Sequence, residues 1–476
     1  MNIRAPFKTL LAHVQTESAA ALNALDLPLG HANVPVPPKF HDLASEAYCA
    51  NSARELVHVK DLSESTSWAT AATTNALSWC HADDEGFGTS VYVQAGHKIW
   101  VVARRRDRVA GRDEMADVRV FDGWSVDTLD PKIWEVEAVY LDGRCVLCVL
   151  FHPCSQHHSL SNILPSYMRP CTMHCVLGTD NTIVLGRHFY ATGTIQRTCF
   201  GIVHAFVMGS FITNTFHVDD TRSLPRQMLG AWYRHLVLHD GFESEYLVFT
   251  SSSSLMQGAE PSPHVPNMLT HCGVFDVINL GCIVELNAAL DRARYKSDYR
   301  EDDEKKLRDL EQESQSRTFF RVIMKTFASK YFLKVGPTVE HPTLIWQSHL
   351  VKFAVVVLGY MKAKFNIVRK EPGLTPEALE TRLRLHFQTD HPHLLPAFNA
   401  AITDIPAPRE LDWAGPPVRV LRRTNVSMPL LRASGSGERR KGFHWPLHRS
   451  DDQLNQAPVD AFYEGAWPHD DSDDDE

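Results

Sequence analysis

The sequence has no apolar run long enough to cross a lipid bilayer, which needs roughly 18–20 residues. Its two best apolar stretches, 202–212 and 353–361, have the length of buried core segments. An excess of basic charge is also lacking, because 48 Lys and Arg against 57 Asp and Glu give a net charge of -9. A nucleic-acid footprint over the whole chain is therefore not visible. We expect no membrane association, and nucleic-acid binding is left open.

A secretory signal peptide is lacking as well. Arg4 and Lys8 precede the first acidic residue, Glu17, but the repeated Arg and Ser of a transit peptide are absent, so we expect an ordinary first helix. Ten cysteines are spread along the chain. Without a signal peptide, this pattern is typical of reduced thiols in the cytosol or nucleus. We expect a nuclear or cytoplasmic protein.

Zinc-binding cysteine clusters are missing too. The closest pair, Cys145 and Cys148, lies in the apolar run 145–151, where residues three apart face opposite sides of a strand. Zinc knuckles instead place two cysteines on a tight turn. We interpret the pair as buried strand cysteines. The sequence also shows no paired zinc finger, PHD-type cluster, Tudor-like module or internal repeat.

What is present divides the chain into four parts. Residues 1–45 combine a helical pattern with a proline-rich linker, and residues 46–205 carry short β-rich runs between turn signals. Residues 206–403 have helical periodicity, and residues 404–476 are rich in Pro, Gly and Ser. This order predicts a β-sandwich or barrel, then a mainly α-helical region, then a disordered tail. The strands are predicted at 90–93, 98–103, 118–121, 134–141, 145–151, 182–186 and 188–191.

Three helical segments are predicted in the second half of the chain. Residues 287–320 are highly charged and favour a solvated helix with i,i+4 ion pairs. Residues 344–368 and 376–402 have the pattern of amphipathic helices that pack on a core. The basic stretch 419–449 indicates either a nucleic-acid or nuclear-localisation patch, or a linker that pairs with the ten acidic residues of 451–476.

The most specific feature of the β-rich region is a pair of candidate metal ligands. A site of two histidines and one carboxylate needs a His and an acid two residues apart, because residues i and i+2 of a strand face the same side. Three such pairs occur, about the number that chance gives: His81/Asp83, His217/Asp219 and His469/Asp471. The first directly precedes an alternating strand pattern. We therefore predict His81 and Asp83 as ligands.

A lysine follows this pair at a characteristic spacing. The segment 78–100 begins Ser-Trp-Cys-His-Ala-Asp, continues through a strand pattern, and ends Gly96-His-Lys98-Ile-Trp100. It resembles the core of the JmjC family of Fe(II)- and 2-oxoglutarate-dependent oxygenases, in which a His-x-Asp or His-x-Glu pair precedes a Gly and then Lys-x-Trp. The resemblance covers residues 46–205. It implies an α+β chain with a double-stranded β-helix core of the jelly-roll or cupin type.

The resemblance also assigns roles to single residues. It implies that Lys98 neutralises the distal carboxylate of 2-oxoglutarate and that Ser78 contacts the same group. A buried lysine on a strand requires an anionic partner in any case. The distal ligand is expected well downstream, on a strand after a proline-containing turn, where His174 fits better than His152, His157 or His158. His188 is expected to be a wall or core residue.

The implied activity is that of a dioxygenase, either a hydroxylase or a demethylase, that binds Fe(II) through His81, Asp83 and His174. It would convert the co-substrate 2-oxoglutarate to succinate and carbon dioxide while oxidising a histone, another protein or a different substrate. Val91 stands where histone demethylases of the family often carry Asn, so demethylation is one hypothesis among several. The alternative is a catalytically inactive cupin that serves as a chromatin or protein-binding scaffold. Such a scaffold has no need for a lysine facing a metal pocket, which favours the enzyme.

Overall fold

The computed structural model describes residues 7–15, 21–29, 66–105, 131–132, 134–143, 168–209, 222–238, 241–242, 265–297, 299, 304–365, 373–405 and 415–423. All of them fall within Met1–Asn425, the first of the chain's two units. The predicted strands 118–121 and 145–151, the proline-rich linker and the tail beyond residue 423 lie outside the described residues.

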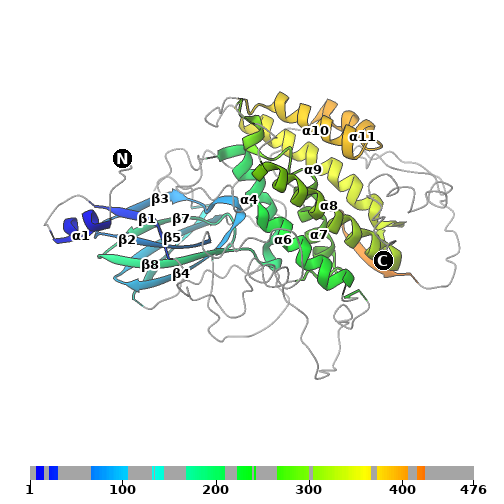
Figure 1. Ribbon diagram of the computed structural model, residues 1–476. Helices are drawn as coiled ribbons and strands as arrows, with labels where there is room; N and C mark the ends of the chain where they lie inside the picture. The colour runs from blue at the N-terminus through cyan, green and yellow to red at the C-terminus, as the bar shows by residue number, and fades with distance from the viewer. Residues whose placement is uncertain are drawn as a thin grey trace, which may run out of the picture. The chain divides into compact units, whose positions relative to one another are not determined.

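Eight strands form two four-stranded sheets in which every pairing is antiparallel (Figure 1). The first sheet has the order β1-β2-β8-β4 and the second the order β3-β7-β5-β6. Their bounds are β1 Asn23–Pro28, β2 Ser67–Ala72, β3 Leu77–His81, β4 Gly88–Ala95, β5 Lys98–Arg105, β6 Trp134–Leu141, β7 Met173–Gly178 and β8 Thr182–Phe189. The predicted strands at 90–93, 98–103 and 134–141 correspond to β4, β5 and β6. The two strands predicted at 182–186 and 188–191 are one continuous strand, β8.

The two sheets share one apolar core. Val91 of β4 and Val184 of β8 pack with Trp100, Val102 and Val176 of the other sheet. These residues alternate with outward-facing ones because successive side chains of a strand point to opposite sides. The chain is thus a mixed α/β protein whose antiparallel sheets are compatible with a cupin-like core, while the double-stranded β-helix itself stays a prediction.

The described part of the N-terminal segment contains one helix and one strand. Helix α1, Phe7–Gln15, follows the predicted helical pattern. Strand β1 pairs with β2, and the amide of Leu22 donates to Thr73 Oγ1 at 2.9 Å. Residues 21–29 therefore belong with the β-rich part, and the boundary predicted at residue 46 is wrong for this stretch. Asp26 and Pro28 are depleted in strands, so local composition does not reveal β1.

Helices follow the eight strands along the chain. Their bounds are η5 Thr192–Thr194, α4 Ile195–Met208, α6 Ser223–Tyr233, η7 Arg234–Leu238, α7 His271–Glu285, η9 Arg292–Tyr295, α8 Glu304–Lys330, α9 Pro342–Lys364, α10 Pro376–Asp390, α11 Leu395–Ala401 and η10 Ile402–Asp404. Thr270 and Thr375 cap α7 and α10 by accepting from the amides of Gly273 and Ala378. By length and composition, α9 alone among the described helices could span a membrane, but 83% of its apolar 18-residue window is buried, as in a core helix.

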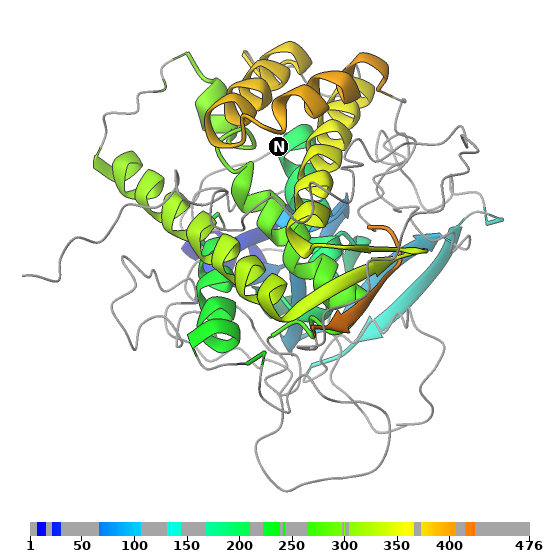
Figure 2. The same cartoon turned by 90° about the vertical axis from the view of Figure 1, so that its right-hand side faces the viewer.

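A third sheet corrects the prediction that residues 404–476 are disordered throughout. It has the order β10-β9-β11, with β9 Tyr331–Val335, β10 Thr338–Glu340 and β11 Val418–Arg422. Figure 2 shows the orange β11 beside the yellow-green β9. In the register of these two strands, Val420 lies opposite Leu333. The partner strand is more than eighty residues away in sequence. Local composition, which is rich in Pro and Arg there, does not report such a pairing.

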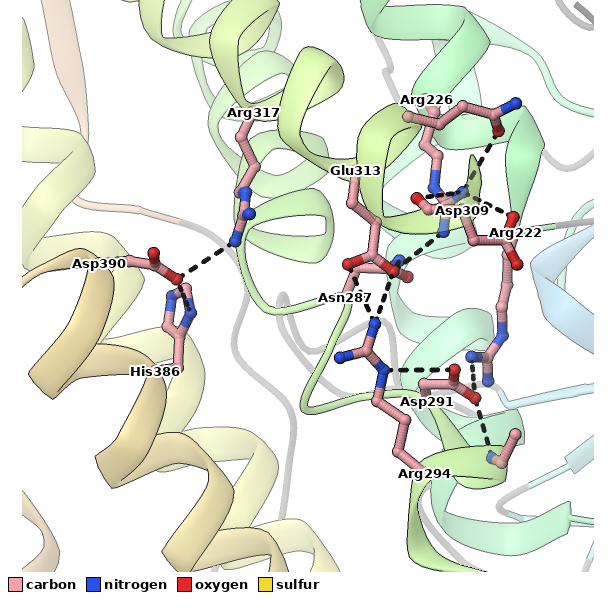
Figure 3. A network of polar contacts seen from close by, with 12 residues as sticks. Arg222, Arg226, Asn287, Asp291, Arg294, Asp309, Glu313, Arg317, His386 and Asp390 are labelled. Atoms are coloured by element: carbon pink, nitrogen blue, oxygen red, sulfur yellow. Dashed lines mark hydrogen bonds and ion pairs between the residues drawn. The ribbon is translucent and has the colours of Figure 1, made fainter. Parts of the chain in front are cut away.

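The charged segment 287–320 also differs from the single solvated helix that was predicted. It contains the short helix η9 and only the first part of α8, and Glu313 of α8 is buried. Figure 3 shows Arg226 and Arg294 both pointing toward Glu313, at 3.1 and 3.3 Å. Asn287 donates to the same carboxylate at 2.7 Å. The charges pair across helices in the interior, where removing one partner costs about 3–5 kcal/mol.

Candidate metal centre

The three predicted metal ligands converge on one point. His81 ends β3 and lies opposite His174 of the neighbouring strand β7, with ring centroids 4.2 Å apart. Asp83 follows β3 by two residues. The possible ligand atoms of the three side chains all lie within 4.8 Å of one another. That limit is somewhat longer than the roughly 3–4 Å expected around one ion with metal–ligand bonds near 2.0–2.2 Å, and their role as ligands stays a prediction.

A β-bulge places His81 on the cavity side of β3. The register between β3 and β7 shifts between Ser78 and His81, so that two residues of β3, Trp79 and Cys80, oppose one residue of β7. Without the extra residue, Ser78 and His81 would face opposite sides because they are three apart. With it, both line the same cavity, while Trp79 is 71% exposed. The Ser78 hydroxyl accepts from Asn23 Nδ2 of β1 at 3.0 Å.

Backbone carbonyls select the tautomer of both histidines. The Nδ1 atom of His81 lies 2.6 Å from the carbonyl oxygen of Trp79, and Nδ1 of His174 lies 2.9 Å from that of Thr172. A carbonyl can only accept, so each Nδ1 carries the proton and donates. Each Nε2 is then left with its lone pair for a cation. Hydrogen bonds of this kind orient the metal-ligating histidines of known sites.

A threonine and a third histidine hold the carboxylate, an arrangement that the sequence does not predict. Thr89 of β4 donates to Asp83 Oδ2. The Thr89 hydroxyl also lies 2.9 Å from Nδ1 of His188 on β8, which is the residue opposite it in the sheet. His188, predicted as a wall or core residue, lines the cavity and supports the carboxylate through Thr89. No sequence signal marks the contact, because it depends on the pairing of β4 with β8.

The protonation states suit a divalent cation. Burial and then the neighbouring His174 lower the pKa of His81 to about 4. Burial alone would raise the pKa of Asp83, but three histidines and the Thr89 hydrogen bond together hold it below its usual value. At neutral pH the site therefore presents a neutral imidazole and a carboxylate. This donor set fits Fe(II), which binds two histidines and one carboxylate on one side and leaves further positions open.

The ligands border a cavity of about 70 Å³ that also contains Lys98. Its lining comes from both four-stranded sheets and from two residues outside them, Asp83 and Met168: Leu25, Trp68, Thr70, Ser78, His81, Asp83, Thr89, Lys98, Trp100, Met168, His174, Val176 and His188. The predicted cofactor residues Lys98 and Ser78 and the predicted ligands thus share one cavity. Trp100 stacks on His174 at 5.7 Å and forms part of its wall.

Lys98 is a buried cation whose partner is missing from the described part of the chain. Its side chain is 4% exposed, and within the described ranges no hydrogen bond or ion pair reaches its ammonium group. Burial lowers the pKa of Lys98 to about 8, so the group still carries its charge at neutral pH. Leaving a charge buried and unpaired is costly. The cavity is therefore suited to an anion at this end.

Helix α4 fixes the loop that carries Asp83. This loop continues into the short helix η1, Asp84–Gly86, where Glu85 and Gly86 have positive φ values of 51° and 69°. The Thr198 hydroxyl donates to the Gly86 carbonyl at 3.0 Å, and the Tyr190 hydroxyl donates to that of Glu85 at 2.7 Å. The loop packs so closely on α4 that a Cβ at Gly86 would collide with the Thr198 backbone, and a Cβ at Gly201 would collide with the Gly86 backbone.

The remaining candidate residues lie elsewhere. His152, His157, His158, Cys145 and Cys148 fall outside the described residues, as do His217, Asp219, His469 and Asp471. A second group with metal-ligating chemistry joins Glu285, His386 and His391. However, Arg321 contacts both oxygens of Glu285, at 2.7 and 2.8 Å. The guanidinium already neutralises that carboxylate, so we interpret the group as a structural ion-pair network.

Comparisons with known proteins do not show to which family the chain belongs. No protein-family model and no curated protein matches the chain. A solved structure of YcfD, a ribosomal oxygenase from Escherichia coli, is 12% identical over 58% of this chain and 69% of its own, with a TM-score of 0.18. An X-ray structure of E. coli YcfD is 12% identical over 85% and 90%, with a TM-score of 0.19. YcfD in complex with cobalt and 2-oxoglutarate is 11% identical over 84% and 89%, with a TM-score of 0.17. These values are too low to assign the chain to a family or an activity.

Proposed function

We propose that this protein is an Fe(II)- and 2-oxoglutarate-dependent dioxygenase. The observation that carries the proposal is the shared cavity, which is lined by three candidate ligands and by a buried lysine that has no partner among the described residues. The three candidate ligands require a positively charged partner, and the lysine requires a negatively charged one. The two imidazoles and the carboxylate of Asp83 suit a cation, and Lys98 suits an anion. A small dicarboxylic keto acid that chelates the metal at one end and meets Lys98 at the other satisfies both.

The residues in and around the cavity would have different roles in the reaction. His81, Asp83 and His174 would hold Fe(II), which with 2-oxoglutarate and oxygen supplies the oxidative decarboxylation that drives substrate oxidation. The Lys98 ammonium would donate to the distal carboxylate of the co-substrate, with the Ser78 hydroxyl beside it. Trp68, Trp100 and Met168 would form apolar walls that exclude water. Thr89 and His188 would hold Asp83 in its position.

The alternative, an inactive scaffold with the same sheets, differs in one measurable respect. A scaffold has no need to bind 2-oxoglutarate, so Lys98→Met would stabilise it without any loss of ligand binding. In the enzyme, the same replacement should lower the affinity for 2-oxoglutarate. Lys98→Met should keep the metal but weaken 2-oxoglutarate binding by roughly 10- to 150-fold, because a hydrogen bond to a charged group contributes about 1.5–3 kcal/mol.

The test is anaerobic binding of Fe(II) and 2-oxoglutarate to the full chain, followed by succinate production in air. His81→Ala should abolish iron binding, whereas His97→Ala should not, because His97 lies outside the cavity and contacts Asp180. Lys334→Met is the matched control for Lys98→Met, since Lys334 is exposed on β9. If Lys98→Met bound 2-oxoglutarate as tightly as the wild type, the role of Lys98 would be refuted.

A further inference from the structure

The bulge that presents His81 also brings two thiols together on the other side of the same strands. Between Ser78 and His81 the register with β7 shifts by one residue, and Cys175 is the residue of β7 that lies opposite the extra length of β3. The register therefore places the Cys80 and Cys175 side chains beside each other, on the face of the two strands that is turned away from the cavity. Both cysteines are in the reduced form. Neither residue lines the metal-binding cavity.

We propose that Cys80 and Cys175 are an oxidation site that forms a reversible disulfide between β3 and β7. Cysteines on adjacent strands can be bridged when their Cα atoms lie about 4.4–6.8 Å apart and their side chains point toward each other. Residues opposite each other on adjacent antiparallel strands meet the first condition, and side chains on the same face of both strands meet the second. This proposal does not depend on the proposed enzymatic function.

The chemistry requires a two-electron oxidant, for which hydrogen peroxide is the simplest. The sulfur of Cys80 attacks one peroxide oxygen, the O–O bond breaks, and a sulfenic acid and one water form. The sulfur of Cys175 then attacks the Cys80 sulfur, the S–O bond breaks, and a second water leaves with the remaining thiol proton. In sum, two thiols and one peroxide give one disulfide and two waters.

Exposure assigns the order of these two steps. Cys80 is partly exposed and its neighbour Trp79 is 71% exposed, so peroxide reaches this sulfur from the open side of the strand. Cys175 is only 8% exposed and therefore acts second, as the resolving thiol. The other described thiol near His174, that of Cys171, donates instead to the Arg197 carbonyl of α4 at 3.8 Å. It is not the partner in the bridge.

The position of the bridge connects it to the candidate metal centre. Cys80 precedes His81 and Cys175 follows His174, so a disulfide would fix the bulge that turns His81 toward the cavity. Thiol oxidation would thereby act directly on the two strands that carry both histidines. Because the thiols lie outside the cavity, the bridge can form whether or not the cavity is filled.

The test treats the full-length protein with dilute hydrogen peroxide and counts thiols in denaturant before and after dithiothreitol. We expect the loss of two thiols, a mass decrease of two hydrogen atoms, a linked peptide containing Cys80 and Cys175, and full recovery by dithiothreitol. Cys80→Ser and Cys175→Ser should each abolish this link. Cys272→Ser, which removes an exposed thiol on α7, should leave it unchanged.

Two outcomes would overturn the proposal. One is oxidation of Cys80 to a sulfenic, sulfinic or mixed species with no linked peptide in a protein that remains folded by circular dichroism. The other is a linked peptide that joins Cys80 to a cysteine other than Cys175. Since serine is close in size to cysteine, the single variants should fold. The wild-type result decides the question even if one of them does not.

Discussion

Replacing Gly201 by alanine should separate helix α4 from the loop that carries Asp83. A Cβ at this position would lie 2.6 Å from the Gly86 amide nitrogen and closer still to its Cα, and 2.9 Å from Cys171 Sγ. Gly86 presents backbone atoms, which no rotamer change can move away. The helix and the loop must therefore separate by roughly 1 Å before the contact reaches van der Waals distance.

The expected change in the free energy of unfolding follows from two opposed effects. Alanine is favoured over glycine inside a helix by about 1 kcal/mol, which alone would stabilise the variant. Overpacking a close contact costs about 1–3 kcal/mol, and here two backbone segments collide, so the upper part of that range applies. We expect a net loss of about 1–2 kcal/mol. Displacement of the loop should also weaken metal binding by about 10- to 100-fold, as loss of a residue that orients a ligand does.

The assay is urea unfolding together with equilibrium dialysis against Co(II), with Gly193→Ala as the matched control. Gly193 lies in η5 directly before α4, and a Cβ there would meet nothing within 4 Å. The control should unfold and bind metal as the wild type does. If Gly201→Ala were as stable as the control and bound Co(II) equally well, the close contact of α4 with the Asp83 loop would be refuted.

Three further predictions concern the contact that holds Asp83, the ion pair of Glu285 and two buried histidines. Thr89→Val should keep the fold but weaken Co(II) binding about 10- to 100-fold, because Asp83 loses its donor; unchanged affinity would contradict the role given to Thr89. Arg321→Met should cost about 3–5 kcal/mol in urea unfolding, because Glu285 would be left as a buried charge; unchanged stability, or tight Zn(II) binding by the wild type at Glu285, would contradict the ion-pair interpretation. Burial lowers the pKa of His204 and of His349 to about 3, so the folded state binds fewer protons than the unfolded state below pH 6.5. Stability should be complete above pH 6.5 and fall as the pH drops toward 3, by about 2 kcal/mol for each histidine at pH 5; equal urea midpoints at pH 7 and pH 5 would contradict this.

The sequence was informative where a local pattern carries the chemistry. His81 and Asp83 could be chosen from three equivalent pairs because an alternating strand pattern follows them. Lys98 could be placed because its spacing from His81, in Gly96-His-Lys98-Ile-Trp100, resembles the pattern of a known family. The structure brings these residues and His174 to one cavity, as the prediction requires, while their roles as ligands and anion partner remain to be measured.

The sequence was uninformative where the structure depends on distant pairing. Strands β1 and β11 have the composition of linkers and form only because β2 and β9 offer a free edge. The Thr89–His188 contact depends on the register of β4 against β8. The burial of Glu313 in α8 depends on arginines from α6 and η9. No window of local sequence contains both partners of any of these contacts.

The central claim, that one cavity binds both a metal and 2-oxoglutarate, is tested most directly by anaerobic dialysis of the wild-type chain against Fe(II) with and without 2-oxoglutarate. We predict one bound iron per chain, tighter iron binding in the presence of 2-oxoglutarate, and succinate production when oxygen is admitted. Because binding linkage is reciprocal, bound iron should in turn tighten the binding of 2-oxoglutarate by the same factor. A wild-type protein that binds no iron even at saturating 2-oxoglutarate would contradict the account.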